Sequence, residues 1–111
     1  MKGIEIKPKW FFKTFPGLYG MVLFPFVLLN PFVHISERTI NHERVHVKQA
    51  LEMLVIPFYV WYLIELVVRA IQYRDWNKGY CNISFEREAY GNDLNLDYLT
   101  QRKWYAWIKY L

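Results

Sequence analysis

Cysteine is almost absent from this chain, because Cys81 is the only one among 111 residues. A single thiol excludes an internal disulfide framework, and it is too few for a zinc ribbon or a redox pair of cysteines. If the chain binds a metal ion, histidine and carboxylate side chains must therefore supply the ligands.

The sequence also lacks a recognisable signal peptide. Its first apolar stretch starts only after Lys13 and has no small-residue cleavage site. Internal repeats, low-complexity tracts and linkers are missing as well, so a single domain over residues 1–111 is expected. These features predict a location in the cytoplasm or at a membrane.

Clustered charge is missing too. The chain has 14 Lys+Arg and 10 Asp+Glu, a formal net charge of +4, and its basic residues are spread over both ends. Without a basic stripe along one element, a nucleic-acid partner is not expected. Apolar residues are abundant instead: 54% are hydrophobic and 20% aromatic, so much surface must be buried in the fold, against a partner or against a membrane.

An uncharged run covers residues 18–35. Two prolines within it would break or kink a helix, while its valine, phenylalanine and tyrosine residues favour extended chain. Two short strands are therefore predicted at 19–24 and 26–29, or one strand bent at Pro25, followed after an Asn-Pro turn by an extended piece at 32–35.

A helix is predicted to follow from about residue 37 to 55. Ser36 is a typical N-cap, and Glu37 stands in the first turn, where a carboxylate suits the helix dipole. Pro57 should end or kink this helix, after which a second helical segment continues to Tyr73.

This second segment is apolar on all sides. Its uncharged stretch at 53–64 is shorter than the roughly 20 residues that span a bilayer, so a buried or interfacial helix is favoured. Glu65 and Arg69 stand four residues apart and are expected to form an ion pair. An integral membrane protein with spans at 18–35 and 53–73 is the alternative.

The last third of the chain is predicted to be less regular. The polar stretch at 74–82 contains a glycine and is expected to be a loop. Ser84 is expected to cap a third helix over residues 85–99. The terminal residues 101–111 are expected to form an amphipathic helix or a turn-rich tail.

The letters HERVH at 42–46 are the motif that indicates chemistry. A helix places residues i and i+4 on one face with Cβ atoms roughly 5–6 Å apart, so His42 and His46 can reach one ion. Glu43 lies beside that ion, where a general base can take a proton from water. Two incidental histidines on a solvated helix face are the competing interpretation.

A catalytic zinc site also needs a third protein ligand. The only other histidine, His34, lies upstream on the expected extended piece and is interpreted as an ordinary surface or core residue. A downstream carboxylate is the better source, and the stretch FEREAY supplies both Glu86 and Glu88. Glu52 is interpreted as a solvated or paired carboxylate.

The order of these features resembles the gluzincin class of zinc metallopeptidases, and the short length is similar to the minigluzincins. Strands, a helix with H-E-x-x-H, an intervening helix and a helix with E-x-x-A follow one another over about residues 18–98. CAAX-prenyl endopeptidases and thermolysin-like enzymes take their third ligand from such a downstream helix. The resemblance implies an α+β fold and zinc held by His42, His46 and Glu86, with Glu43 as general base.

One position departs from that family, which usually has an aspartate four residues after the ligand glutamate to orient the first histidine. This chain has Tyr90 there. The Tyr90 hydroxyl is expected either to accept the same hydrogen bond or to stabilise an oxyanion. Glu88 is the alternative ligand, but it loses the match to Ala89. Glu86 is favoured, since it shares a helical face with Tyr90 and Asp93.

Two hypotheses about function follow. The first is a zinc metallopeptidase that hydrolyses a peptide or protein substrate, with Glu43 and Tyr90 as catalytic residues. The second is a non-catalytic zinc-binding protein, associated with a membrane, whose site serves stability or is covered by its own C-terminal segment. Peptide hydrolysis distinguishes the two.

Overall fold

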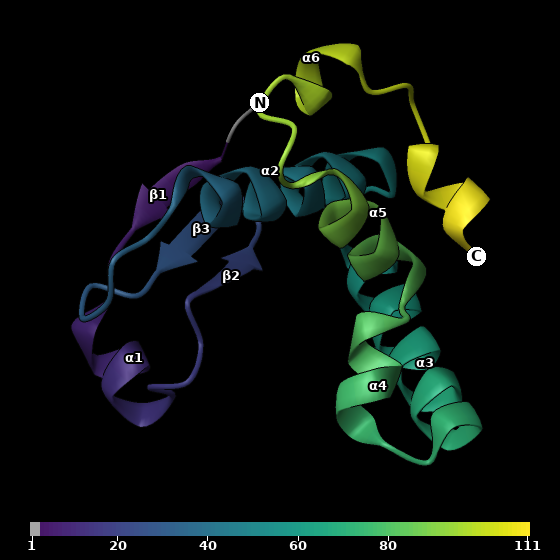
Figure 1. Cartoon of the computed structure of the whole chain (residues 1–111), viewed down its shortest axis with the longest axis horizontal. Helices are drawn as coiled ribbons and strands as arrows, with labels where there is room; N and C mark the ends of the chain where they lie inside the picture. Colours follow the sequence, from purple (N-terminus) through teal and green to yellow (C-terminus); the bar gives the residue numbers. More distant parts are fainter. Residues whose placement is uncertain (1–2) are drawn as a thin grey trace.

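The computed structural model describes residues 3–111, and in this range it has the expected α+β architecture of a small sheet and six α-helices (Figure 1). The elements are β1 (Ile4–Ile6), α1 (Lys9–Thr14), β2 (Gly20–Leu23), β3 (Phe26–Leu29), α2 (Glu37–Glu52), α3 (Ile56–Tyr73), α4 (Trp76–Cys81), α5 (Ser84–Asn92), α6 (Tyr98–Gln101) and the 3-10 helix η1 (Ala106–Tyr110).

The sheet has the strand order β1-β3-β2. The predicted strands at 19–24 and 26–29 are confirmed as the antiparallel hairpin of β2 and β3, whereas β1, which pairs parallel with β3, was not expected. The extended piece predicted at 32–35 forms no strand, and its first residues lie in a turn instead. The Asn30 side chain accepts a hydrogen bond from the Phe32 amide, and the chain turns there before α2.

The sheet packs on α2. Three strand residues, Val22, Val27 and Leu29, form a buried apolar cluster with Val47 of α2. Because side chains of a strand alternate between two faces, this cluster fixes which face of the sheet is turned toward the helix that carries the HERVH motif. The edge strand β2 therefore lies along one side of α2.

Helix α2 begins as predicted, since the Ser36 hydroxyl oxygen accepts a hydrogen bond from the Thr39 amide. It ends at Glu52 rather than at residue 55, because Leu54 and Val55 take left-handed φ values of 58° and 67°. Pro57 stands in the first turn of α3, which continues to Tyr73 as predicted.

Among the described residues, no single helix is both long and apolar enough to cross a bilayer. Helices α2 and α3 meet the criteria of length and composition only as a pair, and that pair is bent by 114°. Residues 18–35, one of the two spans considered, contain the β2–β3 hairpin.

The loop predicted at 74–82 is wrong, because α4 occupies most of it. Asp75 caps this helix by accepting hydrogen bonds from the amides of Asn77 and Lys78. Gly79 serves close packing rather than a turn: a Cβ atom at this position would lie 2.6 Å from the backbone nitrogen of Ala70 on α3. Helices α3 and α4 can therefore approach each other closely.

The start of α5 also differs from the prediction. Ser84 is the first helical residue rather than the cap, and its amide and hydroxyl both donate to the carboxylate of Glu65 on α3, at 2.6 Å each. Glu65 forms the expected ion pair with Arg69 at 3.5 Å, but its main partner is thus the positive end of another helix.

The C-terminal part is turn-rich, the second of the two expected forms. Helix α5 ends at Asn92 rather than near residue 99, and α6 and η1 follow as short helical pieces. Trp107 is buried and packs edge-on against Phe85 of α5 and Trp61 of α3. These contacts fix the end of the chain on the side of α5 away from the sheet (Figure 1).

Candidate metal centre

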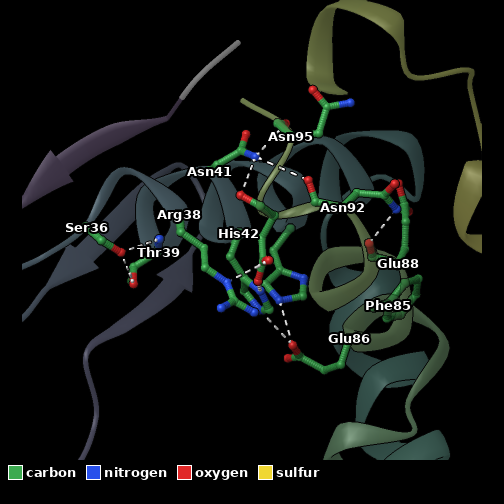
Figure 2. Close-up of polar contacts among 12 residues, drawn as sticks. Ser36, Arg38, Thr39, Asn41, His42, Phe85, Glu86, Glu88, Asn92 and Asn95 are labelled. Carbon is green, nitrogen blue, oxygen red and sulfur yellow. Dashed lines mark hydrogen bonds and ion pairs between the residues drawn. The ribbon is translucent and has the colours of Figure 1, made fainter. Parts of the chain in front are cut away.

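Three side chains meet between α2 and α5. The Nε2 atoms of His42 and His46 lie 2.9 and 3.1 Å from the same oxygen, Oε1 of Glu86. All three residues are buried, and one potential ligand atom from each falls within 4.8 Å of the other two. Figure 2 shows His42 and Glu86 pointing toward each other from the two helices.

The ring of His42 is oriented by a carboxylate. Asp93, just after α5, accepts from His42 Nδ1 at 3.0 Å and from Arg38 Nε at 2.8 Å. An ionised carboxylate can only accept, so Nδ1 of His42 carries the proton. Asn41 fixes this loop by donating to the backbone carbonyls of Asp93 and Asn95, at 3.0 Å each (Figure 2).

The ring of His46 is oriented by an amide. Both hydrogens of the fully buried Gln49 Nε2 have acceptors, the Phe85 carbonyl and Glu88 Oε1, at 3.0 Å each. Gln49 therefore presents Oε1, an acceptor, to Nδ1 of His46 at 2.8 Å. Nδ1 of His46 must donate, and Nε2 of the neutral ring carries a lone pair.

The donor set fits a zinc ion. In their neutral forms both imidazoles direct a lone pair at an anionic oxygen, and three acceptors at this distance repel one another unless a cation lies between them. Two histidine nitrogens and one carboxylate oxygen are the protein ligands of a common type of catalytic zinc site. The hydrogen bonds to both Nδ1 atoms are the outer contacts that such ligands make.

Protons compete for the same position. Burial lowers the pKa of His46, but the adjacent Glu86 carboxylate outweighs this and raises the pKa to about 9. Burial raises the pKa of Glu86, but His46 and His42 outweigh it and hold the pKa well below its ordinary value. Ionised Glu86 is thus ready to bind a cation, whether a metal ion or a proton on histidine.

Tyr62 of α3 holds the second oxygen of this carboxylate. Its hydroxyl donates to Glu86 Oε2 at 2.6 Å, while Oε1 faces the histidines. Because the hydroxyl occupies Oε2, Glu86 offers one oxygen to an ion. A third helix therefore contributes to the orientation of the cluster.

Glu43 lies beside the cluster without joining it. Its carboxylate has no hydrogen-bond partner among the described residues, although the residue is only 8% exposed. Burial raises its pKa, an effect that the two histidines oppose. Gly20 of β2 makes room for this side chain, since a Cβ atom there would lie 3.3 Å from Glu43 Oε1. A poorly solvated carboxylate of this kind is a competent base.

Glu43 faces a cleft between the edge strand β2 and helices α3 and α4. Two adjoining hollows of about 870 and 310 Å³ share Leu18, Gly20, Glu43 and Tyr80 as lining residues. The larger hollow reaches His42 and the smaller, mostly apolar one reaches His46. The candidate metal ligands are therefore accessible from the cleft.

The outer backbone edge of strand β2 faces this cleft, and Tyr59 occupies one end of it. The Tyr59 hydroxyl bonds the outward-facing Val22 carbonyl and Phe24 amide, at 3.0 and 2.9 Å. Since backbone groups alternate in direction along a strand, those of Gly20 face the same way as those of Val22. Gly20 and Val22 both line the smaller hollow, so an extended peptide in it would meet these groups.

Tyr90 does not occupy the orienting position, because Asp93 accepts the hydrogen bond from His42. The Tyr90 ring instead packs edge-on against His42, with 4.4 Å between ring centroids, and lines the larger hollow. It is 44% exposed. Tyr90 therefore does not fill the first of its two expected roles, and the second, hydrogen bonding to an oxyanion, stays a prediction.

Glu88, the alternative ligand, points away from the histidines. It is fully buried and accepts from Arg102 and from the Tyr98 hydroxyl. Arg102 also donates to Glu52 at 2.8 and 2.9 Å, so Glu52 is a paired carboxylate, one of its two expected states. The ion pairs of Arg102 with Glu52 and Glu88 hold the C-terminal segment away from the cleft. No residue after Asp93 lines either hollow.

The roles of Gln49, Asp93 and Tyr62 were not predicted. Gln49 had a signal in the sequence, since it follows His46 by three residues on the same helix. Asp93 was expected on the helical face of Glu86, but its contact with His42, like that of Tyr62 with Glu86, depends on how α5 and α3 pack against α2. His34 is exposed and takes no part in the cluster.

No protein-family model, curated protein or solved structure matches this chain. The resemblance to gluzincins therefore depends on the motif residues, and the function that it implies is a proposal.

Proposed function

We propose that this protein is a zinc-dependent metallopeptidase. The observation that carries the proposal is the convergence of His42, His46 and Glu86 beside a buried, unpaired Glu43 at the base of a cleft. The order of the three ligands along the chain is that of the gluzincins.

A zinc ion held there would polarise the scissile carbonyl and lower the pKa of a water molecule. Glu43 takes the proton of the attacking water and passes it to the leaving amine. Tyr90 donates its hydroxyl to the oxygen of the former carbonyl as negative charge develops on it. Asp93 and Gln49 hold the two imidazoles in the tautomer that leaves Nε2 free.

The substrate is a peptide in extended conformation. The edge of β2 supplies the backbone groups of Gly20 and the amide of Val22 to pair with such a chain, since the Val22 carbonyl already accepts from Tyr59. The smaller hollow, with Met21 and Phe58 in its wall, takes an apolar side chain next to the scissile bond.

Replacing Glu43 tests the mechanism. We expect Glu43→Gln to keep one zinc ion per chain by elemental analysis and to lose at least ~100-fold in the hydrolysis of fluorogenic peptide libraries. Glu37→Gln is the matched control, because it removes an exposed carboxylate from the same helix; it should keep both zinc and hydrolysis. Full hydrolysis by Glu43→Gln would exclude this role.

A non-catalytic zinc protein is the second candidate. It is favoured by the burial of the three ligands, whose exposed fractions are 6%, 5% and 2% for His42, His46 and Glu86. A structural zinc site stabilises a fold without chemistry. This candidate is supported if chelation lowers the melting temperature while peptide libraries and casein stay uncut.

A further inference from the structure

Helix α1 and the segments on either side of it display an exposed set of basic and large apolar side chains. This set, here called the α1 patch, consists of Lys7, Lys9, Trp10, Lys13, Phe15, Leu18 and Tyr19, all of them exposed. Trp10 is 74% exposed, Tyr19 56%, Phe15 50% and Leu18 41%. Tryptophan and phenylalanine are seldom displayed together in this way on a surface that contacts only water.

The fold fixes the α1 patch in place. A six-residue helix is not stable alone, and Phe12, which is fully buried, anchors α1 to the rest of the chain. Burial of Phe12 leaves Lys9, Trp10 and Lys13 on the surface of the same short helix. The exposure of these three side chains therefore follows from the packing of α1.

The charge of the α1 patch has one sign. The sequence has no aspartate or glutamate between Glu5 and Glu37, while Lys7, Lys9 and Lys13 all fall within this interval. None of these three lysines forms an ion pair with any residue in the described range 3–111. The region is thus complementary to an anionic surface.

We propose that the α1 patch docks the protein on an anionic lipid surface. Lysines next to a membrane are attracted by acidic headgroups, and tryptophan and tyrosine settle at the interface, where their rings meet lipid and their polar atoms meet water. Phe15 and Leu18 add apolar area that inserts among the acyl chains. A nucleic acid would use the lysines but leaves Phe15 and Leu18 without a partner, so lipid is the better match.

Docking has a consequence for the cleft. Leu18 lines both hollows and Tyr19 lines the larger one, so the α1 patch and the wall of the cleft share residues. A protein bound through the α1 patch therefore holds one end of its cleft at the lipid surface. Where the proposed function also holds, this position favours peptide segments close to a membrane.

Vesicle co-sedimentation tests the proposal with the intact chain. We expect binding to vesicles of phosphatidylcholine with phosphatidylglycerol, little binding to phosphatidylcholine alone, and weaker binding as salt rises. The double variant Lys9→Gln/Lys13→Gln should bind the anionic vesicles about 25-fold more weakly, from about fivefold for each lysine. Trp10→Ser/Phe15→Ser should also weaken binding, with less dependence on salt.

The C-terminal segment supplies a matched control. Trp104 is 73% exposed and follows an exposed lysine, Lys103, so Lys103→Gln/Trp104→Ser removes the same residue types from another surface. Figure 1 shows α1 at the opposite side of the molecule from α6, which directly precedes this control site. The control variant should bind vesicles like the wild type, and circular dichroism should show every variant folded.

Four outcomes overturn the proposal. They are no binding to anionic vesicles, equal loss in the control and in the α1 variants, wild-type binding by the α1 variants, and preference for single-stranded DNA over vesicles at the same salt. None of these measurements depends on zinc or on hydrolysis, so failure of the docking proposal is distinguishable from failure of the proposed function.

Discussion

Asp93 is the residue on which the orientation of His42 depends. It accepts from Nδ1 of the ring at 3.0 Å and is itself held by Arg38 and by the amide of Asn41. A ligand histidine whose outer hydrogen bond is lost rotates more freely and becomes a weaker base. Asp93 thus acts on a metal ion without touching it.

Replacement of Asp93 should therefore weaken zinc binding. We expect Asp93→Ala to bind zinc 10- to 100-fold more weakly, as measured by competition with a fluorescent chelator. Arg38→Gln is the control, because it removes the other partner of Asp93 and keeps the bond to His42. If both variants lose affinity equally, the hydrogen bond to His42 is not the cause.

Zinc binding should also release protons. With its pKa raised to about 9 by Glu86, His46 carries a proton at pH 7 when no metal ion is bound, and that proton must leave before Nε2 can bind zinc. The affinity is therefore expected to fall as pH is lowered from 9 to 6. Titration calorimetry in two buffers of different ionisation enthalpy measures the proton count, and a count of zero would contradict this assignment.

The sequence predicted part of this cluster at the level of residues. The i, i+4 spacing placed His42 and His46 on one helical face, and that relation holds in any helix. Tyr90 was expected either as the partner of His42 or as an oxyanion donor. The partner is Asp93, which the sequence could not indicate because its position depends on where α5 ends. Helix α5 stops at Asn92, and Asn41 then holds the following loop against α2.

At the scale of elements, one buried arginine joins the C-terminal segment to α2 and α5. Only 3% of the Arg102 side chain is exposed, and it lies between Glu52 and Glu88, whose side chains are 1% and 0% exposed. If the cation is removed, the two carboxylates stay buried without a compensating charge, which lowers the stability of the fold strongly. The segment is therefore held by charge as well as by Trp107.

Removal of this arginine should destabilise the fold. We expect Arg102→Met to lower the free energy of unfolding by about 3–5 kcal/mol in urea titrations, because two carboxylates then stay buried without a cation. Glu5→Gln, which breaks the exposed pair with Arg44 at 3.5 Å, should change it by less than about 1 kcal/mol. Truncation from Thr100 also removes the buried Trp107 and should destabilise the fold at least as much as Arg102→Met. A truncated chain of unchanged stability would contradict this account.

The same network predicts a dependence on pH. Burial raises the pKa of Glu88, but hydrogen bonds from Arg102, Gln49 and Tyr98 outweigh it and hold the pKa below its ordinary value of 4.5. A carboxylate with a lowered pKa in the folded state stabilises the fold above its unfolded pKa, and this contribution is lost as pH falls through the folded value.

Unfolding of the chelated protein should show this loss. We expect the free energy of unfolding to fall as pH is lowered from about 5 to 3, and to fall less steeply in Glu88→Gln, which has no carboxylate to protonate. Urea titrations of both proteins at several pH values provide the comparison. Parallel curves would show that other carboxylates cause the loss.

The elements themselves were only partly predictable. Hydrophobic pattern and capping residues were enough for the hairpin, for the start of α2 and for the end of α3. Helix α4 was misread as a loop because Gly79 is a breaker by local propensity, whereas in the fold it permits contact with Ala70. Local signals do not reveal such close packing, and the same limit applies to β1, whose pairing with β3 is distant in sequence.

At the scale of the whole molecule, α2 joins two parts of the fold. One side of it packs on the sheet through Val47, and another meets α5 at Glu86 and α3 through its turn. The candidate metal centre lies at the contact of α2 with α5. An ion there would cross-link two helices through ligands that are 40 and 44 residues apart in sequence.

Removal of metal should therefore lower the stability of the entire chain. A ligand that binds only the folded state stabilises it by about 4 kcal/mol when present at 1,000 times its dissociation constant. For a chain of this size, such a change corresponds to a shift of roughly 10–20 °C in melting temperature. We expect a shift of this order between zinc-loaded and chelated protein in a calorimetric scan.

Two variants make this measurement specific. Glu86→Ala removes one ligand, so its melting temperature should depend little on chelation, whereas His34→Ala removes the exposed histidine and should keep the full shift. A wild-type protein that loses its zinc to the chelator yet melts at an unchanged temperature would show that the ion does not hold α2 and α5 together. An equal shift in Glu86→Ala would instead place the ion elsewhere on the chain.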